Sequence, residues 1–164
     1  MFSFLKKKEA VEDTITVMKA CVSGRAIPVE ELDDGVFSAG IMGKGIAIVP
    51  SSEVIVAPCN GEISAVMEDS GHAVGLRLNN GAELLIHEGL DTVMLNGEGF
   101  ELLVKEGDQV KAGDSLIRFD AHLIESKGLN PACVFLLTNS DAYPNVQFKT
   151  GMDVMANETV VAEF

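Results

Sequence analysis

The sequence predicts an all-β fold, an antiparallel β-sandwich or barrel-like single domain with one or two short helical turns. Its 164 residues fit one domain, which at this length buries roughly 70% of the unfolded surface. The residues are 47% hydrophobic but only 5% aromatic, so aliphatic side chains must build the core. Short apolar segments alternate with turn signals, the rhythm of a β-sandwich or barrel. These signals are Gly24, Asn60-Gly61, Asn79-Asn80-Gly81, Asn96-Gly97, Glu106-Gly107-Asp108 and Ala112-Gly113-Asp114.

Helix is expected in two places only. In residues 120–128, Asp120 can cap the first turn, Gly128 can end the helix and Pro131 prevents its continuation. A second helical turn is expected within residues 28–37. We therefore expect helix to be the minor component of the fold.

The domain is expected to span residues 13–164, preceded by a flexible N-terminal tail, residues 1–12. The tail places Phe2, Phe4 and Leu5 beside three lysines, so it would make a weak membrane-surface contact if helical, the alternative being a frayed terminus. Its basic residues follow a very short apolar patch, an order and length that do not fit a signal peptide. No apolar run approaches membrane-spanning length. We expect a cytoplasmic protein that is neither exported nor integral to the membrane.

Charge and cysteine content exclude several classes of function. Twelve basic residues against 25 acidic ones give a net charge of -13, which repels a nucleic-acid backbone. The same charge can steer a basic protein partner or simply maintain solubility. The three cysteines are widely spaced and form no CxxC pair, so they suggest neither a disulfide framework nor a zinc knuckle. A reducing compartment fits the cysteines, and the acidic charge alone favours a role in solubility over a protein partner.

Two of the chain's three histidines, His72 and His87, flank the turn signal Asn80-Gly81. A two-residue type I′ turn there would pair Val74 with His87, and Leu76 with Leu85. His72 would then lie diagonally from His87 on the same face, about 7–8 Å apart at the backbone. That face would also carry the aliphatic side chains Val74, Leu76 and Leu85.

Paired imidazoles on an aliphatic surface can hold a metal, act as base and nucleophile, or stabilise a charged group on one of them. Two unrelated histidines in a sheet are an equally good interpretation of the spacing alone. The residues around them distinguish these possibilities.

His87–Val93 has the sequence HEGLDTV, and other segments carry further similarity to a known family. They are residues 22–50 (VSGRAIPVEELDDGVFSAGIMGKGIAIVP), 54–76 (VIVAPCNGEISAVMEDSGHAVGL), 97–120 (GEGFELLVKEGDQVKAGDSLIRFD) and 131–141 (PACVFLLTNSD). Together they resemble the glucose-type enzyme IIA family of the bacterial phosphoenolpyruvate-dependent sugar phosphotransferase system. The resemblance extends from about Val17 to Glu163.

The resemblance implies a phosphocarrier in the transferase class, an antiparallel β-sandwich that needs no cofactor and no metal. The histidine of the HxGxDTV motif, here His87, would accept phosphate from phospho-HPr and pass it to a cognate IIB domain of a sugar permease. His72 would stabilise the phosphate, with support from Ser70 and Asp91. The family's docking surface corresponds to Val36, Phe37, Ile41, Met42, Met67, Leu85 and Val93.

The chain departs from the family pattern at several positions: at Glu88, at Lys44, where an acidic residue is common, and at Met67, where larger aromatic residues are frequent. Family members usually carry an apolar residue where this chain has Glu88. A carboxylate beside a phosphohistidine would be repelled if both side chains shared a face, but the strand pleat should point Glu88 away from His87.

Two other classes of function were weighed. A small β-barrel zinc hydrolase would use His72 and His87 as metal ligands, but it needs a third ligand, and His122 lies in the expected helical turn. A biotinyl or lipoyl carrier shares the Gly-Asp turns of residues 102–119, but it needs a modified lysine at a hairpin tip. The nearest match, VMKAC at residues 17–21, lies outside such a hairpin. The hydrolase therefore lacks a third ligand and the carrier module lacks its lysine, so the sequence supports both alternatives poorly.

Overall fold

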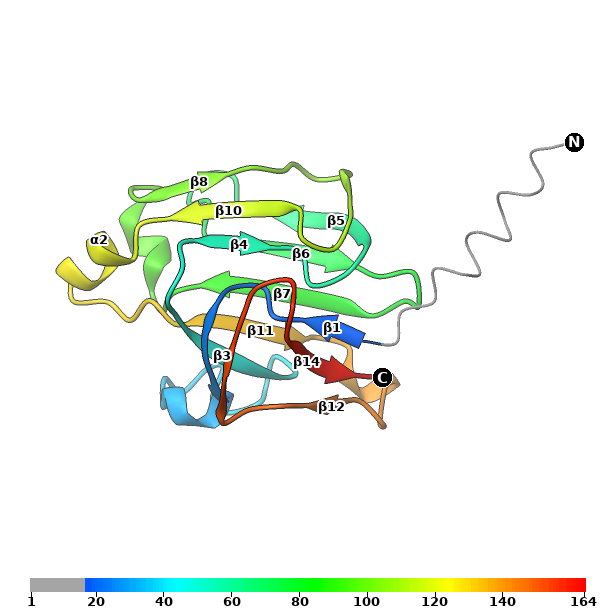
Figure 1. Ribbon diagram of the computed structural model, residues 1–164. Helices are drawn as coiled ribbons and strands as arrows, with labels where there is room; N and C mark the ends of the chain where they lie inside the picture. The colour runs from blue at the N-terminus through cyan, green and yellow to red at the C-terminus, as the bar shows by residue number, and fades with distance from the viewer. Residues whose placement is uncertain (1–16) are drawn as a thin grey trace, which may run out of the picture.

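A computed structural model describes residues 17–164, so the predictions for the tail, residues 1–12, lie outside the described residues. An eight-stranded sheet forms one layer of the molecule (Figure 1). All its strand pairs are antiparallel, as the sequence predicted. Its strands, in spatial order, are β13 (Met152–Val154), β2 (Gly24–Pro28), β3 (Lys44–Pro50), β11 (Cys133–Leu137), β7 (Glu83–Glu88), β6 (Ala73–Arg77), β5 (Gly61–Val66) and β9 (Gln109–Val110).

Two three-stranded antiparallel sheets lie in front of the large sheet in Figure 1. A shared core of mainly aliphatic side chains joins the three sheets, with Ile55 and Ile117 from one small sheet and Ala162 from the other packed with Ile86 of the large one. This confirms the predicted all-β sandwich with an aliphatic core. One small sheet contains β1 (Val17–Lys19), β14 (Val160–Glu163) and β12 (Gln147–Phe148), and the other contains β4 (Val54–Val56), β10 (Ser115–Phe119) and β8 (Phe100–Leu102).

The expected helical segments form where their capping residues predict them. Helix α2 (Ala121–Ser126) begins after Asp120, whose Oδ1 accepts a hydrogen bond of 3.0 Å from the backbone N–H of Leu123. Gly128 follows it with a φ of 79°, a left-handed conformation suited to glycine. The turn expected within residues 28–37 is the 3₁₀ helix η1 (Val29–Leu32). Two further 3₁₀ helices are η2 (Thr92–Leu95) and η3 (Ser140–Ala142).

A second, smaller cluster of apolar side chains lies on the opposite face of the large sheet. Val134 and Leu136 of β11 pack there against Val29 and Phe37, whereas Phe135 and Leu137 of the same strand enter the main core. Strand β11 is therefore buried on both faces. The segment from η1 to β3 covers this outer face next to the end of β7, and so forms one side of the histidine site.

The hairpin between β6 and β7 has a register one residue away from the predicted one. Leu76 pairs with Leu84 and Ala73 with His87, instead of Leu76 with Leu85 and Val74 with His87. The N–H of Leu78 bonds to the carbonyl of Ala82, so Asn79-Asn80-Gly81 is a three-residue loop and not a two-residue turn. The predicted register is therefore wrong.

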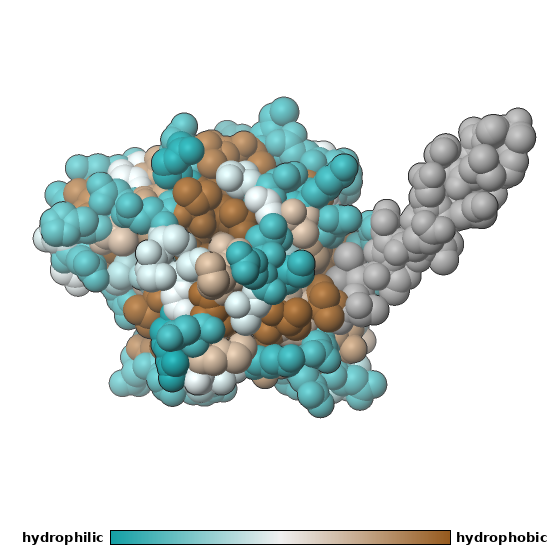
Figure 2. Space-filling view, viewed as in Figure 1, coloured by the Kyte–Doolittle hydropathy of each residue, from teal (hydrophilic) through white to brown (hydrophobic). Residues whose placement is uncertain are grey.

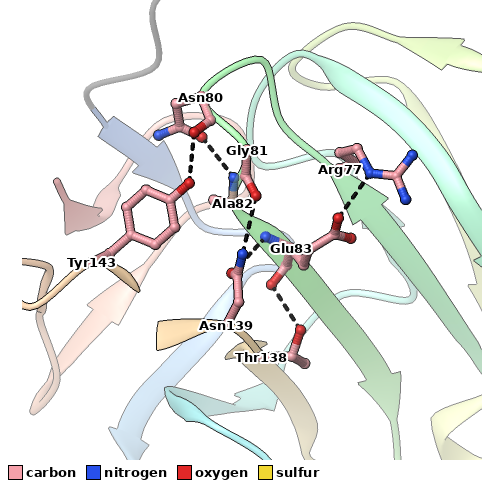
Figure 3. A network of polar contacts seen from close by, with 8 residues as sticks. All are labelled: Arg77, Asn80, Gly81, Ala82, Glu83, Thr138, Asn139 and Tyr143. Carbon is pink, nitrogen blue, oxygen red and sulfur yellow. Dashed lines mark hydrogen bonds and ion pairs between the residues drawn. The ribbon is translucent and has the colours of Figure 1, made fainter. Parts of the chain in front are cut away.

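Side chains from outside the hairpin hold this longer loop (Figure 3). The hydroxyl of Tyr143 donates to the carbonyl of Asn80 at 2.6 Å, and the side-chain amide of Asn139 donates to the carbonyl of Gly81 at 3.1 Å. The same amide accepts from the N–H of Glu83 at 2.9 Å. These partners are distant in sequence, which is why local turn preference could not give the register.

The corrected register changes which residues share a face with His87. Val74 and Leu76, predicted beside the histidines, enter the main core, while Ala73 and Gly75 take their places. Leu85 stays on the histidine face, as predicted.

No helix within residues 17–164 is long and apolar enough to cross a membrane. On the face shown in Figure 2, hydrophobic residues occur in areas separated by hydrophilic ones.

Candidate functional site

His72 and His87 form a close pair on the outer face of the large sheet. Their ring centroids lie 4.5 Å apart, and the rings are nearly perpendicular at 88°. His87 lies near the end of β7, and His72 immediately precedes β6. If β6 extended to His72, the alternation of side chains along the strand would place this ring on the face opposite His87. His72 lies just before the strand, so the two rings meet despite the shifted register. The prediction that the two imidazoles lie side by side is confirmed, although the strand register that brings them together differs from the predicted one.

Ser70 contacts His72 as part of the turn that leads into β6. A hydrogen bond of 2.6 Å joins Ser70 Oγ and His72 Nδ1. Gly71, between them, has a φ of 66°, and a side chain there would contact Phe100. His72 itself is only 2% exposed and lies with its ring 6.3 Å from that of Phe100. The bond occupies Nδ1 of His72 and leaves its Nε2 for another partner.

The residues after His87 form a tight turn that explains the HxGxDTV spacing. Gly89 has a φ of 82°, and a Cβ there would lie 2.3 Å from the side chain of Thr92. Thr92 Oγ1 donates a hydrogen bond of 2.5 Å to the carbonyl of Glu88. Asp91 precedes η2 in a left-handed conformation, which aspartate tolerates better than most residues. Its exposed carboxylate makes no side-chain cap bond but acts on His87 through its charge.

The histidines line an apolar hollow of about 260 Å³. Of the predicted docking residues, Met42, Met67 and Leu85 line it directly. The large exposed apolar side chains in this set are Val36 at 50%, Ile41 at 81%, Met42 at 39%, Met67 at 47% and Val93 at 49% exposure.

Phe37 has a different position from the other docking candidates. It is 8% exposed, and its ring centroid lies 4.9 Å from that of His87. It therefore packs against the imidazole on the side that η1 covers, where it restricts the ring's orientation.

Burial keeps both imidazoles neutral near pH 7. It lowers the pKa of His72 from 6.5 to about 4, with a further contribution from His87. Burial also lowers the pKa of His87, against the opposing effects of the Gly89 backbone and the carboxylates of Asp34 and Asp91. A neutral imidazole has the free electron pair that a nucleophile needs.

Three residues near the site were not predicted from the sequence. Asp34 accepts hydrogen bonds from the backbone N–H groups of residues 36–38, so it shapes the loop that carries Phe37 and also acts on His87. An aspartate at the start of DDGVFS is a recognisable turn signal, but its distance from His87 is a tertiary property. Phe100 packs beside His72, and Met94, 69% exposed, follows Val93 in η2.

Glu88 points away from His87, as predicted, and is fully buried in the main core. It pairs with Cys133 of β11 across the sheet, and the thiols of Cys21 and Cys133 lie 3.7 Å apart. Neither carboxylate oxygen has a hydrogen-bond partner among the described residues. Burial raises the pKa of Glu88 well above its usual value and Cys21 raises it further, while the adjacent Cys133 thiol, which lies outside hydrogen-bond geometry, lowers it. The adjacent residues of β7 therefore occupy opposite environments.

The geometry does not favour the zinc hydrolase. Among residues 17–164, no group of three or more His, Cys, Asp or Glu side chains is arranged to hold a metal ion. His122 is exposed on α2 and does not line the hollow.

The chain is similar to known proteins over nearly its whole length. A family model described as phosphoenolpyruvate-dependent sugar phosphotransferase system, EIIA 1, matches residues 16–143. A solved structure, the glucose permease IIA from Mycoplasma capricolum, has a TM-score of 0.79 and 33% identity, covering 90% of this chain and 94% of that one.

Three curated relatives include two EIIA components of about the same length as this chain and one much longer EIIBCA component. The glucose-specific EIIA component of Bacillus anthracis is 41% identical over 92% of this chain and 88% of its own length. That of Staphylococcus epidermidis is 38% identical over 99% and 98%. The mannose-specific EIIBCA component of Corynebacterium glutamicum is 40% identical over 95% of this chain, which spans only 22% of that longer protein.

Proposed function

The chain belongs to the EIIA 1 family of the phosphoenolpyruvate-dependent sugar phosphotransferase system, and we propose that His87 is the residue that carries its phosphoryl group. The protein is a phosphocarrier of the sugar phosphotransferase system. The observation that supports the assignment of His87 is the perpendicular pair of neutral imidazoles in an apolar hollow.

Phosphoryl transfer requires a nucleophile in line with the donor bond. Nδ1 of His87 is buried and out of reach of a docked donor, so we place the phosphoryl group on Nε2. A new P–N bond forms there as the P–N bond to the donor histidine of phospho-HPr breaks. In a second displacement, the P–N bond at His87 breaks as the phosphorus bonds to a cysteine sulfur of the cognate IIB domain, and His87 returns to its neutral form.

His72 stabilises the transferred group. If Ser70 Oγ–H donates to Nδ1 of His72, Nε2 carries the proton and can donate it to a phosphoryl oxygen. The two rings lie close enough for this donor to reach a substituent on His87. Ser70 then acts as a positioning residue by selecting the tautomer of His72.

The docking surface for phospho-HPr and for the IIB domain consists of the hollow and its rim. The rim is the set of exposed apolar residues Val36, Ile41, Met42, Met67 and Val93. Apolar residues around the histidines exclude water from the phosphohistidine while two proteins are docked. The net charge of -13 would attract a basic donor surface, with the exposed Asp91 as a local contact point. A IIB domain as acceptor agrees with the fused EIIBCA relatives.

We further infer that the chain acts in the cytoplasm. The reducing conditions there suit three free, buried cysteines. Contact of residues 1–12 with a membrane surface remains a prediction from the sequence.

The assignment can be tested by incubating the protein with phosphoenolpyruvate, enzyme I and HPr, and then mapping the acid-labile phosphate. We expect one phosphoryl group on His87 and none on the His87→Ala variant. His122→Ala is the matched control, because His122 is exposed on α2 away from the hollow. Label at another residue, or full labelling of His87→Ala, would show that the assignment is wrong.

A further inference from the structure

Two methionines line the histidine hollow with their side chains partly exposed. Met42 is 39% exposed and Met67 47%. They approach the hollow from different parts of the sequence, Met42 from the segment before β3 and Met67 from the segment after β5. The thioethers of both residues are therefore accessible at the surface on which phosphoryl transfer depends.

The cysteines, which oxidants usually attack first, are shielded. Cys21 and Cys133 are 0% exposed, and Cys59 is 5% exposed. Burial raises the pKa of Cys59 to about 12, so its reactive thiolate is scarce. Contact with Cys21 and burial raise the pKa of Cys133 in the same direction. A thioether needs no deprotonation to react, which leaves exposed methionines as the accessible sulfur atoms.

We propose that Met42 and Met67 form an oxidation-sensitive site, at which conversion to methionine sulfoxide by a peroxide slows phosphoryl transfer through His87. This inference rests on the proposed function of His87. In the reaction, the thioether sulfur attacks one oxygen of hydrogen peroxide, an S–O bond forms and the O–O bond breaks. The sulfur loses two electrons, and the other peroxide oxygen leaves as water.

Oxidation of Met42 and Met67 would weaken docking because the hollow is lined by apolar side chains. Apart from the two histidine rings, the side chains that line it are apolar. A sulfoxide is polar and accepts strong hydrogen bonds, so burying it against a docked partner without a donor carries a desolvation cost. The change would weaken docking while the fold persists, because neither methionine belongs to the main core.

Of the two other methionines that are exposed among residues 17–164, Met94 lies beside Val93 near the site, and Met155 provides the matched control. Met155 is 57% exposed, more than Met42 or Met67. It follows β13, which lies four strands from β7 in the large sheet, and it does not line the hollow. Oxidation at Met155 should proceed as readily and leave transfer unchanged.

The experiment treats the whole protein with hydrogen peroxide in the presence of a metal chelator, quantifies oxidation at each methionine by peptide mass spectrometry, and measures phosphoryl transfer from phospho-HPr. Each variant is compared with its own untreated rate. We expect the wild type and Met155→Leu to lose on the order of tenfold in kcat/KM once Met42 and Met67 are oxidised. The double variant Met42→Leu with Met67→Leu should lose less than twofold.

Two results would overturn the inference. One is a wild-type protein that keeps its rate with both Met42 and Met67 fully converted to sulfoxides. The other is a double variant that loses activity as the wild type does. Untreated wild type provides the separate test of the proposed function: if it takes label on His87 and only the effect of oxidation is missing, the phosphocarrier assignment stays and the oxidation site is wrong.

Discussion

The two faces of strand β7 place adjacent residues in opposite surroundings. His87 points outward into the hollow, where it contacts the rings of His72 and Phe37. Glu88 points inward and is 0% exposed, next to two thiols. Burial disfavours the charged form of both side chains, lowering the pKa of His87 and raising that of Glu88, but only His87 has a polar ring beside it on the outer face.

The comparison separates function from stability within one strand. Removing a group from the outer face should reduce phosphoryl transfer and affect folding little, because the hollow contributes few core contacts. Removing the carboxyl group from the inner face should change folding and leave transfer intact, because it acts on the core alone. Variants of the outer face should therefore change the rate of phosphoryl transfer, and variants of the inner face should change the free energy of unfolding.

The largest effect is expected for His72→Ala. Loss of a donor to the phosphoryl oxygens should lower kcat for transfer from phospho-HPr by about 10²–10³-fold. KM should change much less, because His72 is buried beneath the docking rim. Rapid-quench measurement of His87 labelling checks this. His72→Gln, whose amide can still donate, should recover part of the rate, and an unchanged kcat in His72→Ala would remove the role assigned to that ring.

Glu88→Leu should stabilise the protein by about 1–3 kcal/mol, because it replaces an unpartnered buried carboxyl group with an apolar side chain of similar size. Urea unfolding measures the change, and labelling of His87 should stay as in the wild type. A destabilised Glu88→Leu variant would mean that the carboxyl group has a favourable partner in the core.

Glu88 also makes the free energy of unfolding depend on pH. Its pKa is raised in the folded protein above the ordinary value of 4.5, so the folded state binds more protons than the unfolded state. Its contribution to stability is therefore fully present below pH 4.5 and is lost as pH rises through the folded pKa. Relative to Glu88→Gln, which does not titrate, the wild type should become less stable from pH 4.5 upward. Parallel unfolding curves of the two proteins at all pH values would contradict this.

The outer face should make stability depend on pH in the opposite direction. The pKa of His72 is lowered from 6.5 to about 4, so between these values the unfolded state binds more protons and stability falls as pH decreases. NMR titration of the imidazole Cε1–H should give a midpoint of about 4 for His72 and one below 6.5 for His87. Midpoints at or above 6.5 would show that the rings are more hydrated than their geometry indicates.

Much of the architecture could be predicted from local patterns. Turn signals and aliphatic segments indicated the antiparallel sandwich, and Asp120 with Gly128 located α2. The resemblance of the HEGLDTV segment to a known family indicated His87, and the same resemblance indicated His72 and Ser70 as its neighbours. Each of these signals depends on residues close together in the sequence, where backbone preference and capping act directly.

The register of the hairpin between β6 and β7 could not be predicted from these local patterns. The dipeptide Asn80-Gly81 favours a two-residue turn, and both faces of the hairpin carry apolar residues, so hydrophobicity could not correct the error. Bonds from Asn139 and Tyr143 to the loop accompany the register that forms instead. The histidines still meet because His72 precedes the strand.

Local periodicity, turn signals and a short motif were enough to predict the fold class and the two histidines that pair. Long-range packing set the register of β6 against β7, the burial of Glu88 beside Cys21 and Cys133, and the contact of Phe37 with His87. These features depend on which distant segments pack together, and the energy of such contacts is not encoded in the order of neighbouring residues.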